Sequence, residues 1–138
     1  MSAVFDTNVV LDLLLDRAPH AAAAVELFNR VERGELRAML GATTFTTIHY
    51  LAAKAVGAKQ AKAQVAALLT LFEVAPVTRA VLDQALANGM ADFEDAVLAE
   101  AGRQAGATAI VTRNVRDFRG GPLRVYTPQQ WLALPAAT

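Results

Sequence analysis

The chain contains no cysteine among its 138 residues, which excludes a disulfide-stabilised fold, a cysteine nucleophile and a thiolate zinc site. It also lacks net charge, since 13 Lys and Arg balance 13 Asp and Glu, so any nucleic-acid site must be local. No apolar run approaches the roughly 18 residues of a membrane span. The apolar N-terminal stretch has no basic flank and is interrupted by Asp6, unlike a secretory signal. We therefore expect one cytoplasmic domain over residues 1–138 with no membrane partner.

What is present is enough apolar residues for a core, with 54% hydrophobic and 19% charged residues. Short apolar runs alternate with longer segments in which apolar residues recur at helical spacing. We expect strands at 3–5, 36–40, 72–74, 109–112 and 124–126. We expect helices at 9–14, 21–33, 48–56, 58–71, 78–88, 91–104 and from 128, with the threonine-rich 43–47 as a helix entry. This alternation predicts an α/β sandwich of three layers around a mainly parallel sheet of four to five strands.

Acidic residues stand where the predicted strands end. Asp6 follows the first strand, and Asn114 and Asp117 lie just past the strand at 109–112. Asp92 and Asp95 are three residues apart at a helix start, so they share one face. Because ligands of parallel sheets gather beyond the carboxyl ends of the strands, these segments can meet at one edge. A divalent cation, Mg²⁺ or Mn²⁺, would relieve the repulsion between the carboxylates and activate water at a phosphate.

Each acid also has a structural interpretation. Asp6 suits the cap of the helix that follows it, and Thr7 and Asn8 either continue that cap or hold the acid and a water. Asp92 is typical of a helix start, where acids are favoured by the helix dipole. Asp117 can be an ordinary loop acid. Only the joint placement of the acids favours a metal site.

Three blocks in this order resemble the PIN-domain family, the metal-dependent ribonuclease fold that includes VapC-type toxins of toxin–antitoxin operons. The blocks are Val4–Asp12, Asp92–Ala99 and Ile110–Phe118. The resemblance implies a PIN-like fold, a homodimer and a cognate antitoxin that blocks the site. It implies catalytic Asp6, Asp92, Asp95 and Asp117, with Asp6, Asp95 and Asp117 binding Mg²⁺ or Mn²⁺. Supporting roles fall to Thr7, Asn8, His49, Thr112 and Asn114.

One position departs from the family pattern. PIN nucleases usually carry a glutamate early in the third helix, a few residues after a Ser or Thr, and counting along 43–50 puts that position at His49. A neutral imidazole adds no negative charge and prefers Mn²⁺ or Zn²⁺ over Mg²⁺. It can ligate, hold a water or act as a base, or it can be a partly buried helix residue bonded to a neighbour. The alternative function is therefore an RNA- or antitoxin-binding module with weak or no nuclease activity.

Arg113, Arg116 and Arg119 form a local basic cluster beside the acids. Arginine forks suit phosphate oxygens, so this cluster is a candidate RNA-binding surface, although its charges can equally pair with Asp117. The favoured function is hydrolysis of RNA phosphodiester bonds. A haloacid-dehalogenase phosphatase would need an acid at position 8, which is Asn8, and a response-regulator receiver would need a late lysine, whereas none follows Leu71.

Overall fold

The computed structural model describes residues 2–135, and its centre is one five-stranded sheet in the order β3-β2-β1-β4-β5. All four strand pairs are parallel. The strands are β1 (Ser2–Phe5), β2 (Arg37–Gly41), β3 (Glu73–Ala75), β4 (Ala109–Val111) and β5 (Arg124–Tyr126). The predicted sheet of four to five mainly parallel strands is confirmed. Because β1 and β4 are neighbours, Asp6 and Thr112 emerge side by side from the same edge.

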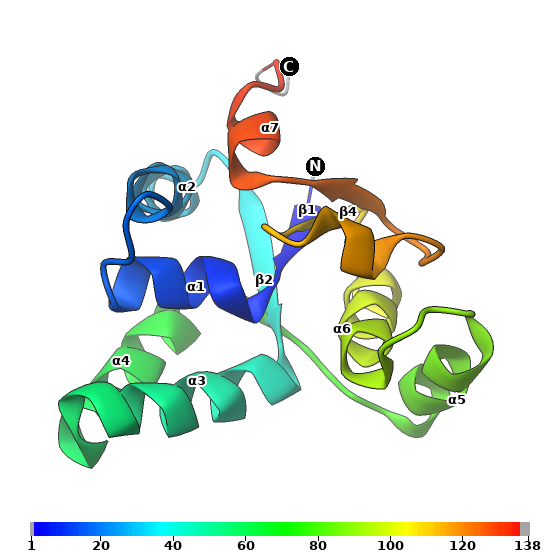
Figure 1. Cartoon of the computed structure of the whole chain (residues 1–138), viewed down its shortest axis with the longest axis horizontal. Coiled ribbons are helices and arrows are strands. Elements are labelled where there is room, and N and C mark those ends of the chain that lie inside the picture. Colours follow the sequence, from blue (N-terminus) through cyan, green and yellow to red (C-terminus); the bar gives the residue numbers. More distant parts are fainter. Residues whose placement is uncertain (1, 136–138) are drawn as a thin grey trace.

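Helices cover both faces of this sheet, as Figure 1 shows, and the predicted three-layer sandwich is confirmed. One face packs against α1 (Thr7–Leu14), α2 (Ala21–Glu32), α3 (Ala42–Val56), α4 (Ala58–Leu71) and α7 (Pro128–Leu132). The other face packs against α5 (Arg79–Ala87), α6 (Phe93–Gln104) and the 3₁₀ helix η1 (Val115–Phe118). Over residues 2–135, no helix combines the length and the hydropathy needed to span a membrane.

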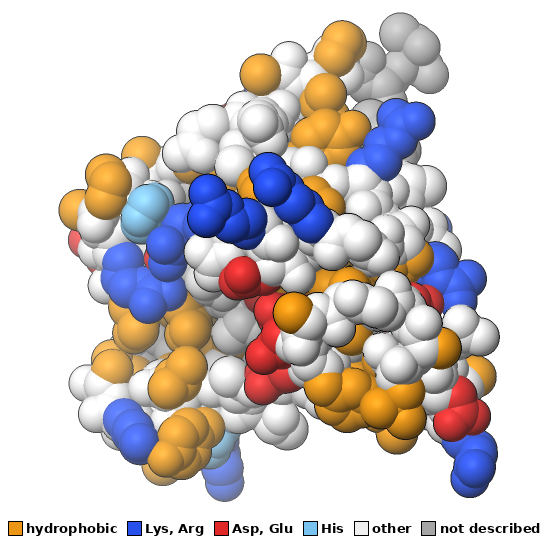
Figure 2. Space-filling model, turned by 45° about the vertical axis from the view of Figure 1, so that its right-hand side comes forward, with side chains coloured by type: hydrophobic (Ala, Val, Ile, Leu, Met, Phe, Trp, Pro, Cys, Tyr) orange, Lys and Arg blue, Asp and Glu red, His pale blue; other side chains and the backbone are white. Residues whose placement is uncertain are grey.

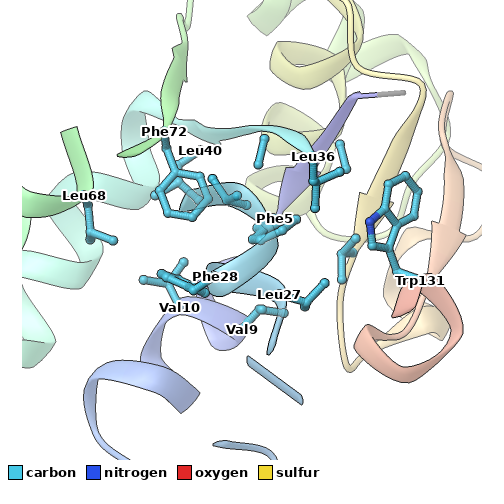
Figure 3. Packing of buried hydrophobic residues seen from close by; sticks show 14 of the residues in the cluster. Phe5, Val9, Val10, Leu27, Phe28, Leu36, Leu40, Leu68, Phe72 and Trp131 are labelled. Carbon is cyan, nitrogen blue, oxygen red and sulfur yellow. The ribbon is translucent and has the colours of Figure 1, made fainter. Parts of the chain in front are cut away.

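The central strand β1 separates two hydrophobic cores because successive side chains point to opposite faces of a sheet. Phe5 points into the larger core, where the ring of Phe72 lies 5.6 Å from that of Phe5 and 5.1 Å from that of Phe28, centroid to centroid. Figure 3 shows this group, with Trp131 packing at its other end. Val4 belongs to the core on the opposite face. Burial on both faces fixes the register of β1 and thus the position of Asp6 at its end.

The start of α3 differs from the sequence-based expectation. The threonine-rich segment was expected to cap a helix beginning near Ile48, whereas α3 begins at Ala42 and no side chain caps it. Thr44 is buried, and its hydroxyl oxygen accepts a hydrogen bond from the Thr7 hydroxyl at 3.2 Å. The threonines therefore lie within the first turns of α3 and do not cap it. The Thr44 hydroxyl contacts Thr7 of α1 and not a free backbone N–H of its own helix.

Helix α6 lies unusually close to the sheet. A Cβ at Gly102 would stand 2.7 Å from Cγ1 of Val4, and one at Gly41 would stand 2.7 Å from Cδ1 of Leu98. Both distances are shorter than carbon atoms tolerate, so a side chain at position 102 would clash with Val4, and one at position 41 would displace the end of the Leu98 side chain. These contacts fix α6 against β1 and the start of α3, and the acidic N-terminus of α6 is held near Asp6.

Candidate functional site

Asp6 is anchored by three hydrogen bonds to its carboxylate. Oδ1 accepts from the Thr7 backbone N–H at 2.8 Å, which makes Asp6 the N-cap of α1. Oδ2 accepts from the Thr112 hydroxyl at 2.8 Å and from the Asn8 side-chain amide at 3.2 Å. The Asp6 N–H donates to the Val111 carbonyl at 2.9 Å, continuing the ladder between β1 and β4. The Asp6 carboxylate therefore caps α1 and at the same time stands in the candidate site, so the two interpretations of Asp6 do not exclude each other.

The environment of Asp6 disfavours its charged form. Burial raises the pKa of this carboxyl above its ordinary value, and the negative charge of Asp117 raises it further. The hydrogen bonds from Thr112 and Thr7 and the charge of Arg113 lower the pKa but do not cancel the rise. Asp6 is thus held in a fixed orientation where a nearby positive charge would stabilise its ionised form.

Asp95 lies at the point where most of the acids meet. The pKa of its carboxyl is raised to about 7, first by burial and then by the charges of Asp6, Asp92, Asp117 and Glu94, in that order. Figure 2 shows acidic side chains gathered in the middle of one face of the molecule. The three chain segments expected to deliver carboxylates to one sheet edge do bring their charges within reach of one another.

Asp92 and Asp117 belong to two further segments beside these acids. Asp92 caps α6, because its Oδ1 accepts from the Asp95 backbone N–H at 2.9 Å. Asp117 lies exposed in η1. The Asn114 backbone N–H donates to the Thr112 hydroxyl at 2.9 Å, so Thr112 connects Asp6 to the segment that carries Asp117. The side chain of Asn114 is exposed, and the contact to Thr112 comes from its backbone.

The donor chemistry of this site fits a hard divalent cation. Carboxylate and amide oxygens are the ligands that Mg²⁺ prefers, and the Asn8 side-chain oxygen beside Asp6 is buried without a hydrogen-bond partner. Within residues 2–135, no three His, Asp or Glu side chains stand close enough together to enclose a metal ion. Mg²⁺ usually keeps several waters and takes only one or two carboxylates. The residues therefore fit a hydrated cation and not a closed cage of protein ligands.

Arg113, expected in the RNA-binding cluster, forms an ion pair with Asp12. Its Nε donates to Oδ2 of Asp12 at 2.7 Å and its Nη2 donates to Oδ1 of Asp12 at 3.2 Å. Arg17 donates to the same Asp12 Oδ1 at 3.0 Å. The Asp12 side chain is only 1% exposed, so both arginines are needed to compensate a buried charge. Arg116 and Arg119 are exposed, and Figure 2 shows basic side chains along one border of the acidic group.

His49 is not brought to the acids. It lines a crevice of about 290 Å³ together with Phe45 and Thr46 of α3 and with Lys62 and Val65 of α4, and no acid lines that crevice. Five residues along a helix correspond to a turn of about 140°, so His49 faces another side of α3 than Thr44. Its Nε2 is buried and has no hydrogen-bond partner. Counting along the sequence identified a position in the chain but not the face of the helix that it occupies.

Two functional contacts were missed by sequence reasoning. The hydroxyl pair of Thr7 and Thr44 joins α1 to α3 beside Asp6, and Asp12 binds Arg113 across 101 positions of the chain. For Asp12 a signal existed, because a charged residue between Leu11 and Leu13 lies in an otherwise apolar helix segment and buried charges need partners. For Thr44 the sequence offers no such signal.

Comparison with known proteins agrees with this fold. Similar folds occur in a chain of VapBC-1 from nontypeable Haemophilus influenzae (18% identity, TM-score 0.71, covering 94% of this chain and 99% of that chain). They occur also in a toxin–antitoxin complex from Klebsiella pneumoniae (22% identity, TM-score 0.70, 91% and 97% covered). A third is VapBC2 from Rickettsia felis bound to a DNA fragment from their promoter (14% identity, TM-score 0.70, 92% and 98% covered). No curated protein matches the sequence significantly. The family model of the PIN domain matches residues 2–116, and the chain belongs to the PIN-domain family.

Proposed function

We propose that this protein is a metal-dependent endoribonuclease, the VapC-type toxin of a toxin–antitoxin pair, which hydrolyses RNA phosphodiester bonds at the acidic site. The observation that carries the proposal is the convergence of carboxylates on Asp95, whose pKa is raised to about 7. Mutual repulsion between carboxylates lowers the stability of a fold, and groups with such perturbed pKa values cluster at functional sites. Binding of a cation is the simplest function that would remove this repulsion.

Asp6, Asp95 and Asp117 would hold a hydrated Mg²⁺ or Mn²⁺, one or two of them directly and the rest through its waters, with Asp92 supporting Asp95 from the cap of α6. Such a cation, when bound, lowers the pKa of water and stabilises negative charge on a phosphate. Thr112, Thr7 and Asn8 keep the Asp6 carboxylate in one orientation through their hydrogen bonds. In the cation-free protein the pKa of the Asp95 carboxyl is about 7, so binding of the cation near neutral pH would displace a proton from this carboxyl.

The RNA would be held by the exposed arginines next to the acids. Arg116 and Arg119 flank Asp117 in and after η1 and are exposed. Their guanidinium groups suit phosphate oxygens, and they supply the positive charge that the acidic cluster itself cannot offer to an RNA backbone. Arg113 is engaged with Asp12 and is left out of this role.

The proposed partners are a cognate antitoxin and a second copy of this chain. The solved structures with this fold include toxin–antitoxin and VapBC complexes, and two of these VapBC complexes are bound to DNA. An antitoxin would protect the cell by covering the acidic site. A homodimer would place two such sites beside one another, and sedimentation of the purified protein tests this assembly.

The alternative is a binding module with weak or no nuclease activity, because His49 stands where PIN nucleases usually carry a glutamate. His49 lines the crevice between α3 and α4 and does not supply the carboxylate that a glutamate would add. On the side of α3 next to the acids stand Thr44 and its hydroxyl contact to Thr7.

The proposal is tested with the purified protein, a structured RNA and either Mn²⁺ or Mg²⁺. We expect cleavage that stops when EDTA removes the cation and that is absent in Asp6→Asn. The matched control is Asp83→Asn, since Asp83 lies on α5 and is 64% exposed. RNA that stays intact with the wild-type protein and either cation would exclude the nuclease function, while retained binding of that RNA would favour the binding module.

A further inference from the structure

A groove of about 450 Å³ lies next to the acidic site and has no part in the function proposed above. It runs between α3 on one side and α5 and α6 on the other. Its walls include three threonines of α3, one leucine of α5 and the first two residues of α6: Thr43, Thr46, Thr47, Leu82, Phe93 and Glu94. This volume lies within the range of about 300–1,000 Å³ that is usual for small-ligand pockets.

The groove is directly continuous with the acids through Glu94. Glu94 lines the groove, and its charge also acts on the carboxyl of Asp95, the next residue of α6. A molecule whose phosphate lies at the acidic site can therefore reach into this groove with an adjacent group. Figure 2 shows hydrophobic side chains next to the acidic ones on the same face.

The chemistry of the groove rejects a phosphate and suits a flat, neutral ring. Glu94 and the neighbouring carboxylates repel anions, and no lysine or arginine within residues 2–135 lines the walls. Phe93 is 47% exposed and Leu82 is 40% exposed, although large apolar side chains are normally buried. An aromatic side chain offered to solvent beside a nucleic-acid site is the usual platform on which an unpaired base stacks.

We propose that this groove binds an unpaired nucleobase next to the phosphodiester to be cleaved, with the base stacked on Phe93 and its hydrogen-bond donors facing Glu94. Guanine fits best, because its N1–H and N2–H₂ groups are adjacent donors that match the two oxygens of a carboxylate. Uracil fits worst, because its single N–H stands between two carbonyl oxygens that Glu94 repels. The inference rests on the proposed function for its substrate class, RNA.

The test measures binding and not cleavage, so that it does not depend on the nuclease activity. Short single-stranded RNAs that differ at one base are titrated with the intact protein in EDTA, and affinity is read from fluorescence anisotropy. We expect the guanine RNA to bind best and the uracil RNA least. Phe93→Ala should weaken binding of the guanine RNA about tenfold, as loss of one stacked base does. Phe93→Trp should preserve it, and Glu94→Gln should remove the preference between bases.

Leu86→Ala is the matched control. Leu86 is 74% exposed on α5 and does not line the groove, so its loss tests whether any apolar side chain on this surface would have the same effect. Equal affinity of wild type and Phe93→Ala, or an equal loss in Leu86→Ala, would overturn the base site. Should Phe93→Ala keep its RNA affinity but lose self-association in sedimentation, the groove is a protein interface and the inference is wrong. RNA cleavage by wild type together with unchanged binding by Phe93→Ala, or no RNA binding in EDTA at all, would contradict the base site alone, whereas RNA that stays intact with Mn²⁺ or Mg²⁺ in the cleavage assay would overturn the proposed function.

Discussion

Arg113 and Asp12 form a two-bond ion pair that connects the end of β4 to the buried side of α1. The two contacts measure 2.7 and 3.2 Å, and Arg17 adds a third at 3.0 Å. Arg113 lies between Thr112, which binds Asp6, and Asn114, which binds Thr112. The ion pair therefore fixes the segment that leads to Asp117 relative to the helix that begins with Asp6.

Arg113→Ala should lower the free energy of unfolding by about 2–3 kcal/mol. Removing one partner of a buried ion pair leaves the other charge without its partner. Here Arg17 still compensates part of the buried Asp12 charge. Urea denaturation measures the change. Arg116→Ala is the control, since an exposed arginine should change stability by no more than about 0.5 kcal/mol. Similar losses in both variants would contradict a structural role for the Arg113–Asp12 pair.

Arg116→Ala and Arg119→Ala should each weaken RNA binding and reduce its dependence on salt. Phosphate contacts release condensed counterions, so each lost contact should lower the slope of log affinity against log salt by about one. Binding of Mn²⁺ should be unchanged, because neither guanidinium ligates a cation. A salt slope equal to that of the wild type would show that these side chains do not contact the phosphates.

The stability of the cation-free protein should fall as pH rises from about 4 to about 7. The pKa of Asp95 rises from its ordinary value of 3.8 to about 7 in the fold, so the folded state holds the extra proton over this interval. Its contribution is complete below the unfolded pKa and is lost as pH rises through the folded one. Urea midpoints in EDTA over this interval measure the effect. Asp95→Asn should flatten the curve and Asp83→Asn should not, whereas a wild-type curve without this fall would contradict the raised pKa.

His49→Leu should leave both stability and RNA cleavage nearly unchanged. The Nε2 of His49 is buried without a hydrogen-bond partner in a crevice lined by Phe45 and Val65. Replacing an unpaired buried polar group with an apolar side chain of similar size is close to neutral or stabilising. Thermal unfolding and the cleavage assay measure the two effects. Loss of cation-supported cleavage in a stable His49→Leu protein would place this residue at the site after all.

The positions of the strands along the chain were predictable because they depend on local patterns. The apolar run 109–112 and the acid after 3–5 indicated β4 and the end of β1, and parallel strands bring such ends together. Expected helix bounds at Ala58–Leu71 agree with α4. The placement of Asp6 and Thr112 at one edge of the sheet could therefore be predicted from the sequence, since each stands at the end of a buried strand.

The remaining features depend on contacts that no local pattern records. Whether a threonine caps its own helix or binds another, as Thr44 binds Thr7, is decided by packing. The side chain of Arg113 pairs with Asp12, which lies 101 positions away in the chain. The orientation of His49 depended on which face α3 presents to α4. In each case the residue type was noticed but its partner could not be read from the chain.

The central claim is that the converging carboxylates bind a divalent cation, and the most direct test is a titration with Mn²⁺ followed by electron paramagnetic resonance. The account predicts that wild type and Asp83→Asn bind Mn²⁺ alike, with affinity that increases as pH rises through about 7 because Asp95 must lose its proton. Binding should be lost in Asp6→Asn and weakened in Asp95→Asn and Asp117→Asn. Equal binding of Mn²⁺ by wild type and a folded Asp6→Asn protein would contradict the account.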